Sequence, residues 1–245
     1  MTAPDLFTVL ESTWPAAGRH DIGPWLIREG QGGGKRVSAA TAQPGWQDED
    51  IPAAEQAMAQ LNQPALFMIR EEDVLLDQAL QARGYRIVDP VVAYAAPCAE
   101  LARPAPLPMT TFAHWPPLAI CTELWAEAGI GPGRLAVMDR VQGPKTALLA
   151  RSQDRPAGSA FIACHHDCAM LHALEVRPTL RRQGAGHNIL RAAAGWALDQ
   201  GAQTLAVVVT LGNNPARSLY STLGMQIVGQ YHYRQFGPVQ GALKG

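Results

Sequence analysis

The sequence predicts a protein of the α/β (α+β) class, because apolar runs typical of strands alternate with segments of helical periodicity. The apolar run at residues 169–174 is followed, after a glycine-bearing turn, by a helical pattern at 188–198. A second run at 204–209 is rich in β-branched residues and is again followed by a helical pattern. The alternating runs at 159–163 and 169–176 predict a hairpin.

The turn between the first of these strands and its helix reads V-R-P-T-L-R-R-Q-G-A-G at residues 176–186. Gly184 and Gly186 let the backbone approach a ligand closely, as side chains would not. Unpaired N–H groups and the positive end of the helix dipole converge at the same place. The turn therefore predicts an anion site.

A second motif, N-N-P-A-R-S-L-Y-S-T-L-G-M at 213–225, follows the strand at 204–209. Together the two motifs resemble those of the GNAT acetyltransferase superfamily, and the resemblance runs from about residue 118 to residue 234. The pyrophosphate signature Q/R-x-x-G-x-G/A is matched by Arg181, Gly184 and Gly186. The signature N-x-x-A-x-x-x-Y-x-x-x-G-F is matched by Asn213, Ala216, Tyr220 and Gly224, with Met225 where Phe is usual. The resemblance implies the GNAT fold, a central mixed, mostly antiparallel sheet flanked by helices.

The first half of the chain has a strand and helix pattern of its own. We expect a hairpin of 25–28 and 36–40, a helix at 53–61, a strand at 65–69, a helix at 74–83 and a strand at 91–95. Leu76, Leu80, Gly84 and Tyr85 echo the L-Y-x-x-x-G-F pattern of the second half. This half therefore resembles a reduced, degenerate GNAT-like domain.

The predicted domain boundaries follow from a proline-rich stretch that has no periodicity. We expect a degenerate GNAT-like domain at 1–97, a linker at 98–110 and the catalytic GNAT domain at 111–245. The N-terminal domain is expected to be structural or to wall the acceptor pocket.

Composition is that of a soluble protein. The 245 residues are 47% hydrophobic and carry a formal net charge of −1, so nothing predicts a nucleic-acid or membrane-surface footprint. No stretch is long and apolar enough to span a bilayer, and the first residues do not read as a signal peptide. We therefore expect a cytoplasmic protein that binds neither nucleic acid nor membrane, and a homodimer is one assembly that it could form.

Two further patterns invite a ligand and are better interpreted as turns. Cys164, His165, His166 and Cys168 lie between two alternating runs and lack a second ligand pair, so a hairpin is favoured over a metal site. The loop G-Q-G-G-G-K at 30–35 is followed by Arg36 where a phosphate loop needs Ser or Thr. A flexible hairpin turn is favoured there.

The resemblance assigns acetyl-CoA as co-substrate, with no metal, and names the residues that hold it. The strand preceding the turn splays from its neighbour, so its free backbone groups bind the pantetheine arm, and the Val176 amide is the expected oxyanion donor. Tyr220 is the expected general acid for the departing thiolate, or else packs on the cofactor. Asn213 caps the next helix or bonds the pantetheine. The full set of expected cofactor-binding residues is Leu174, Val176, Arg181, Arg182, Gln183, Gly184, Ala185, Gly186, His187, Asn213 and Tyr220.

The general base is open between two residues of one strand. Alternation places His172, Leu174 and Val176 on one face, and Ala173 and Glu175 on the other. His172 lies where the H-x-L-x-V pattern of arylalkylamine acetyltransferases has a base-relay histidine; the alternative is a histidine hydrogen-bonded inside the sheet. Glu175 is the second candidate base; the alternative is an ion pair with Arg177 or Arg191.

The resemblance implies an acetyl-CoA-dependent N-acetyltransferase that moves an acetyl group to a primary amine of a small molecule, amino acid or peptide N-terminus. Direct attack in a ternary complex is expected, since no cysteine lies in either motif. The alternative functions are a non-catalytic acyl-CoA-binding regulatory module and a structural protein with an incidental G-x-G turn. The acceptor is built from loops without a shared motif, and the sequence does not name it.

Overall fold

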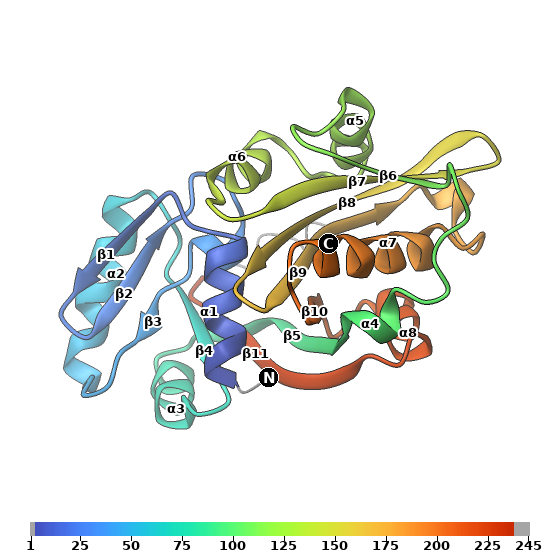
Figure 1. Ribbon diagram of the computed structural model, residues 1–245. Coiled ribbons are helices and arrows are strands. Elements are labelled where there is room, and N and C mark those ends of the chain that lie inside the picture. The colour runs from blue at the N-terminus through green and yellow to red at the C-terminus, as the bar shows by residue number, and fades with distance from the viewer. Residues whose placement is uncertain (1–2, 238–245) are drawn as a thin grey trace.

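The computed structural model describes residues 3–237 (Figure 1). The ends of the two predicted domains, at 1–2 and 238–245, lie outside the described residues. The α-helices are α1 (Ala3–Thr13), α2 (Ile51–Gln60), α3 (Val74–Ala82), α4 (Cys98–Leu101), α5 (Ala119–Glu127), α6 (Pro132–Arg140), α7 (Ala185–Asp199) and α8 (Asn214–Thr222). Short 3₁₀-helices are η1 (Lys35–Val37), η2 (Asp48–Asp50) and η3 (Pro178–Leu180).

Eight strands form one mixed sheet in the order β4-β11-β5-β10-β9-β8-β7-β6. They are β4 (Leu66–Arg70), β5 (Arg86–Pro97), β6 (Thr111–His114), β7 (Lys145–Ser152), β8 (Arg155–His165), β9 (Cys168–Val176), β10 (Thr204–Thr210) and β11 (Gln226–Gln235). All neighbouring pairs are antiparallel except β9 and β10, which are parallel. The predicted mixed, mostly antiparallel sheet flanked by helices is confirmed. A small antiparallel sheet of β1 (Gly18–Ile22), β2 (Trp25–Glu29) and β3 (Thr41–Ala42) lies at one end of the molecule (Figure 1).

The two halves of the chain exchange strands within the large sheet. Strand β11, from the end of the chain, lies between β4 and β5, and β5 in turn lies between β11 and β10. The units β4-α3-β5 and β10-α8-β11 thus interlock, with each unit's second strand beside both strands of the other unit. We propose that the boundary predicted at residue 97 marks a repeat in the chain rather than a separable body.

Helices cover both faces of the sheet. Helix α7 buries Ile189, Leu190, Ala193, Ala194 and Ala197 on one face, at the spacing of a single helical stripe. Helix α1 packs on the opposite face, where Leu6 and Leu10 contact a core formed by both halves of the chain. Helices α5 and α6 cover the same face further along, around Trp14, Trp125 and Phe161.

The N-terminal half differs from the prediction at its first hairpin. Strand β2 is found at Trp25–Glu29, but its partners are β1 and β3, and the predicted strand at 36–40 is wrong. Side chains of this segment contact the large sheet. Lys35 forms an ion pair with Asp89 of β5 at 2.8 Å, and Arg36 forms a hydrogen bond with His172 of β9. The helices at 53–61 and 74–83 and the strands at 65–69 and 91–95 are confirmed, with boundaries shifted to those of α2, α3, β4 and β5.

The glycine-rich loop at 30–34 is not a hairpin turn, because it packs on the start of α6 and leads into η1. A Cβ atom on Gly33 would lie 2.6 Å from Val137 Cγ2, and one on Gly133 would lie 2.5 Å from the Gly32 carbonyl oxygen. Only glycine fits at these two contacts. The loop thereby fixes α6 to the N-terminal half.

The hairpin predicted around Cys164 and Cys168 is confirmed as the turn from β8 to β9. The four cysteines are free and buried, and burial raises the pKa of Cys164 to about 11 and that of Cys168 to about 12. Over residues 3–237, no cluster of three or more His, Cys, Asp or Glu side chains has the form of a metal site.

No helix within residues 3–237 has the length and apolar character needed to cross a membrane.

Candidate active site

The glycine turn at 181–186 forms the start of α7. Gly184 is the N-cap and has φ +85°, a left-handed conformation in which a side chain would be strained. Arg182 is also left-handed, with φ 63°. The N–H groups of a helix's first turn have no partners within the helix. The turn therefore presents backbone donors beside two arginines, a fit for a diphosphate.

Gly186 has a different reason to be small. A Cβ atom at this position would lie 2.9 Å from Leu219 Cδ2 on α8. Gly186 therefore lets the first turn of α7 approach α8, and through α8 the predicted acid Tyr220. The glycines of the motif thus divide their roles between backbone conformation and helix packing.

Strands β9 and β10 separate at the end nearest to this turn. Their parallel pairing covers only Thr204 to Val207 of β10 and Cys168 to Leu171 of β9, although β9 continues to Val176. Toward β10 the backbone of residues 172–176 therefore lies beyond the ladder. The splayed strand predicted at 174–176 is present, and its free edge adjoins the start of α7.

A bulge in β9 overturns the predicted alternation of side chains. Phe161 of β8 pairs with His172, whereas Ser159 pairs with Glu175, so one extra residue is accommodated on β9. Ala173 has φ +50°, and its carbonyl accepts a hydrogen bond from Trp125 Nε1 at 2.9 Å. Leu174 and Val176 consequently face the α7 core, while His172 lies on the opposite face, against α1. The prediction that His172 shares a face with Leu174 and Val176 is wrong.

His172 is held in a closed hydrogen-bond network. Arg36 Nη1 lies 3.1 Å from Nδ1, and Thr13 Oγ1 lies 2.9 Å from Nε2. Thr13 in turn donates to the Val9 carbonyl at 2.7 Å. Arg36 can only donate, so Nδ1 accepts and Nε2–H donates to Thr13. Burial, and then the charge of Arg36, hold the pKa of His172 well below its usual value, so the ring is neutral and both nitrogens are engaged.

Glu175 lies beyond the bulge and is half-buried. Burial raises its pKa, and the charges of Arg181 and Arg134 partly offset that rise. The alternative of an ion pair with Arg177 is wrong, because Arg177 makes a two-bond pair with Glu127 at 2.6 and 2.8 Å. Within the described part of the chain, Glu175 forms no ion pair with Arg191 either. Its carboxylate therefore keeps free acceptor capacity near the open strand edge.

Tyr220 lies on α8 and packs against Tyr94 with ring centroids 5.6 Å apart. Burial raises the pKa of Tyr220, and the nearby Glu175 and Tyr94 raise it further. Its hydroxyl has no hydrogen-bond partner among residues 3–237. Asn213 caps α8 through a 3.2 Å bond from Ala216 N–H, as predicted for one of its two roles.

The remaining predicted cofactor residues surround the turn. Arg181 Nε donates to the Val176 carbonyl at 3.0 Å, which ties the turn to the end of β9. Gln183 accepts a bond from Ser152 at 2.9 Å. Ala185, the first residue of α7, is buried in the core. Burial lowers the pKa of His187, which lies in the first turn of the same helix. Arg182 is exposed. The structure thus brings the predicted residues together at one end of β9. His172 is the exception, because its side chain lies on the face of the sheet that α1 covers.

Comparison with known proteins agrees with this geometry. Residues 118–225 match the model of the acetyltransferase (GNAT) family. Residues 118–225 therefore form a domain of the GNAT superfamily. Membership implies acyl-CoA-dependent N-acetyl transfer in general, and acetyl-CoA is the usual co-substrate of the family.

Full-length similarity to other GNAT proteins shows that the N-terminal half is part of a recurring arrangement. YobR of Bacillus subtilis (strain 168), described as an uncharacterized N-acetyltransferase, is 26% identical over 238 residues, covering 91% of this chain and 94% of that protein. A GCN5-related N-acetyltransferase from Kribbella flavida has a similar fold, with a TM-score of 0.72, 21% identity and 97% coverage of both chains. A tandem GNAT protein from the clavulanic acid biosynthesis pathway has a TM-score of 0.62 at 14% identity, covering 82% of this chain and 76% of that one.

Sequence analysis missed three side chains near the GNAT site. Arg36 belongs to the N-terminal half and bonds His172, and Arg134 belongs to α6 and interacts through its charge with Glu175. Trp125 donates a hydrogen bond to the Ala173 carbonyl at the bulge in β9. None lies in a GNAT motif, and only the fold brings them to β9. The one local signal is the glycine-rich loop before Arg36, whose tight packing places that residue.

Proposed function

We propose that this protein transfers an acetyl group from acetyl-CoA to a primary amine of a small molecule, amino acid or peptide N-terminus. The proposal includes direct attack within a ternary complex. One observation carries it: the start of α7 packs on α8, the helix of Tyr220, and is bonded to the open end of β9 through Arg181 and Val176. Among residues 3–237 the Tyr220 hydroxyl has no hydrogen-bond partner. The helix start, the strand edge and the hydroxyl are each a part that thioester aminolysis needs.

The turn and the strand edge would hold the co-substrate. Backbone N–H groups of residues 182–187 and the side chains of Arg181 and Arg182 are placed to bind the diphosphate. The free edge of residues 174–176 offers backbone donors and acceptors to the pantetheine amides. When bound, acetyl-CoA supplies a thioester carbonyl that an amine can attack.

Tyr220 is the proposed general acid. Its raised pKa keeps the phenol protonated at neutral pH, so its O–H can donate a proton to the departing sulfur. Val176 is the proposed oxyanion donor, through its backbone N–H at the end of β9. Both groups belong to the elements that diverge at the open edge.

Glu175 is the proposed general base, and we propose a positioning role for His172. A raised pKa makes the Glu175 carboxylate a stronger base than an ordinary glutamate, and its oxygens are free to accept a proton. His172 has no free nitrogen, because Arg36 and Thr13 occupy both. Its network instead ties β9, just before the bulge, to α1 and to the N-terminal half.

Direct attack is supported by the state of the thiols. All four cysteines are buried and free, and burial raises the pKa of Cys98 to about 12. A thiol with such a pKa is a poor nucleophile at neutral pH. The amine nitrogen would therefore bond directly to the carbonyl carbon as the carbon–sulfur bond breaks.

A thiol-release assay with acetyl-CoA against a panel of amines, amino acids and peptides tests this function. Acetylated product formed in step with free CoA is the expected result. Tight binding of CoA without transfer to any member would instead favour a non-catalytic acyl-CoA-binding module. Absence of any shift in melting temperature with CoA would contradict both.

The pH dependence of kcat/KM tests the base. With Glu175 as base, activity is lost as pH falls through its pKa, which lies above the ordinary glutamate value. Glu175→Gln should remove this acidic limb and lower kcat/KM by about 10²–10⁴-fold. His172→Gln should leave the limb in place. A limb near pH 6–7 that vanishes in His172→Gln would reverse the assignment.

A further inference from the structure

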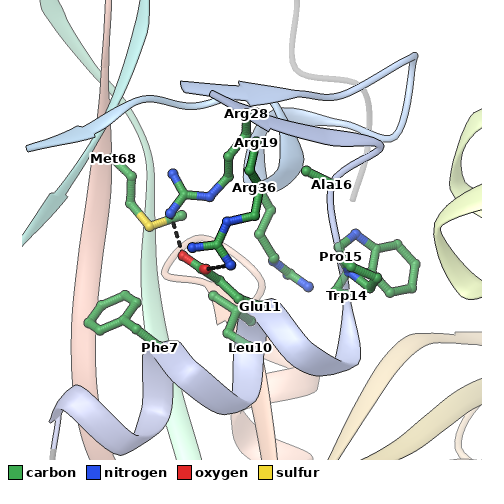
Figure 2. A pocket seen from close by; sticks show the side chains of 10 residues that line it. All are labelled: Phe7, Leu10, Glu11, Trp14, Pro15, Ala16, Arg19, Arg28, Arg36 and Met68. Atoms are coloured by element: carbon green, nitrogen blue, oxygen red, sulfur yellow. Dashed lines mark hydrogen bonds and ion pairs between the residues drawn. The ribbon is translucent and has the colours of Figure 1, made fainter. Parts of the chain in front are cut away.

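A cavity between α1 and the N-terminal sheet contains more positive than negative charge (Figure 2). Its charged lining residues are Glu11, Arg19, Arg28 and Arg36. Glu11 bonds Arg28 and lies 3.0 Å from Arg19, so its carboxylate is shared by these two arginines. Arg28 also donates hydrogen bonds to the Ala39 carbonyl at 2.8 Å and to Thr41 Oγ1 at 3.1 Å. Arg36 has no carboxylate partner in the part of the chain that the structure describes.

Arg36 is the exceptional cation of this group. Its Nε atom is buried and has no hydrogen-bond partner. Among residues 3–237 its side chain has one polar contact, with the neutral His172, and its guanidinium lies 5.8 Å from the centre of the Trp14 ring. A half-buried guanidinium without an anionic partner is costly unless a ligand completes it.

A second cation without a partner stands beside Arg36. Arg134 of α6 is half-buried and, across residues 3–237, forms no hydrogen bond or ion pair. A Cβ atom on Gly34 would lie 3.6 Å from Arg134 Nε, so this side chain lies over the backbone two residues before Arg36. Burial and the charge of Arg36 lower the pKa of Arg134, while Glu175 partly offsets that effect.

The two arginines come from different halves, and both interact with residues of β9, Arg36 by a hydrogen bond and Arg134 through its charge. Arg36 bonds His172, three residues before the proposed base, and Arg134 interacts electrostatically with Glu175 itself. The close packing of Gly33 on Val137 holds the loop of Arg36 against the helix of Arg134. An anionic group bound here would place the rest of its molecule next to Glu175.

We propose that the acceptor is an amine that also carries an anionic group, a carboxylate or a phosphate, and that Arg36 and Arg134 bind this group. The inference rests on the proposed function, whose acceptor class it names. The planar fork of a guanidinium matches the oxygens of either anion. The amine at the other end of the molecule would then face Glu175, and the N-terminal half would contribute to acceptor specificity through Arg36.

Matched acceptors test the inference. Three series of equal chain length are compared in the thiol-release assay: unbranched alkylamines, ω-amino carboxylates and ω-aminoalkyl phosphates. We expect kcat/KM to be at least about 10-fold higher for one anionic series, and the better of the two identifies the anion. Arg134→Gln should reduce this advantage by about 10–100-fold, mainly through KM, and leave CoA affinity unchanged. Loss of the Arg134 charge also raises the pKa of Glu175, but this effect is common to all amines, so the ratio of kcat/KM between the series is the quantity compared. Arg36→Gln should act in the same direction.

The control is Arg86→Gln, which removes an exposed arginine of β5 and should change neither series. Because Arg134 makes no hydrogen bond or ion pair with the described residues, Arg134→Gln should not lower the melting temperature. Equal losses for charged and neutral amines, or a preference for alkylamines, would overturn the inference while leaving N-acetyltransferase activity intact. If no amine is acetylated, the proposed function fails, and calorimetry of an ω-amino carboxylate on the CoA-saturated protein decides. Arg134-dependent binding would support the anion site, and no binding would overturn it.

Discussion

The units β4-α3-β5 and β10-α8-β11 end their helices in the same way. Gly84 and Gly224 both follow the helix with positive φ, 86° and 78°. The next residues, Tyr85 and Met225, donate to the carbonyls of Leu80 and Tyr220 at 3.0 and 3.1 Å. The two units therefore share one backbone design.

They differ where chemistry would occur. Leu80 stands at the position of Tyr220, so the first unit has no hydroxyl at this place. Helix α2, before the first unit, starts after the acidic turn Asp48–Asp50, whereas α7, before the second, starts after two arginines and a glycine. An acidic helix start repels a diphosphate. The repeated backbone thus supplies a scaffold, while a few side chains decide which copy has the features that binding of acetyl-CoA needs.

The largest expected effect comes from the hydroxyl that distinguishes the copies. Tyr220→Phe should lower kcat by about 10²–10⁴-fold with little change in CoA affinity, because the ring that packs on Tyr94 remains. Tyr94→Phe is the matched control, since it deletes a neighbouring hydroxyl that accepts a bond from Arg217. Steady-state kinetics measure both. Full kcat in Tyr220→Phe would restrict this residue to packing.

Gly184 and Gly84 both have a left-handed conformation, but only Gly184 lies at the proposed CoA site. Substitutions at the two positions therefore separate an effect on CoA binding from an effect of backbone strain. Gly184→Asp should weaken CoA by about 100-fold, or roughly 2.7 kcal/mol, because a carboxylate enters the predicted diphosphate site. Gly84→Asp imposes similar backbone strain, about 1–2 kcal/mol, without a ligand nearby. It should lower the melting temperature and leave CoA affinity unchanged.

Calorimetry on the unchanged protein should also give one CoA per chain, bound through α7. Two equivalent sites would show that the first copy still binds the co-substrate, and would revive the loop at 30–34 as a phosphate site. Equal CoA affinity in Gly184→Asp and the parent would contradict the assignment to α7.

The next prediction is on stability and concerns the contact that joins the copies. Asp77 of α3 makes a two-bond pair with buried Arg234 of β11, at 2.7 and 2.9 Å. Asp77→Asn should lower the free energy of unfolding by about 3 kcal/mol, because Arg234 loses its charged partner. Glu127→Gln, which breaks the exposed pair with Arg177, should shift the melting temperature far less.

The pH dependence of the free energy of unfolding is a second test of the ion pair between Asp77 and Arg234. Hydrogen bonds from Arg234 lower the pKa of Asp77 in the folded protein. This stabilisation is therefore present above the unfolded pKa of about 3.9 and is lost as pH falls through the lower folded value. Asp77→Asn should abolish that part of the acid sensitivity. If Asp77→Asn lost stability with falling pH as the parent protein does, the ion pair with Arg234 would not be the contact that stabilises the joined copies.

Much of the second copy could be predicted because its motifs are local. The turn at Gly184, the strand at 204–209, the cap at Asn213 and the helix of Tyr220 each depend on neighbours in sequence. The bulge at Ala173 could not be predicted, because it depends on Trp125, distant in the sequence. One inserted residue was enough to reverse the face assigned to His172.

The N-terminal half was less predictable for the same physical reason. Its glycine-rich loop is shaped by contact with α6, and Arg36 is placed by β9 and α1 rather than by its own neighbours. Strand exchange is likewise invisible to periodicity, since β5 has the same pattern whichever strands flank it. The predicted domain boundaries, compartment and homodimer stay predictions.

The place of β11 has a consequence for synthesis of the chain. Strands β4 and β5 are not neighbours, because β11, the last strand of the described residues, separates them. While the ribosome is still making residues 226–235, the first unit lacks the strand that joins its two edges. The N-terminal half therefore has no complete sheet to fold into before residues 226–235 emerge, and sheet closure must wait for that strand.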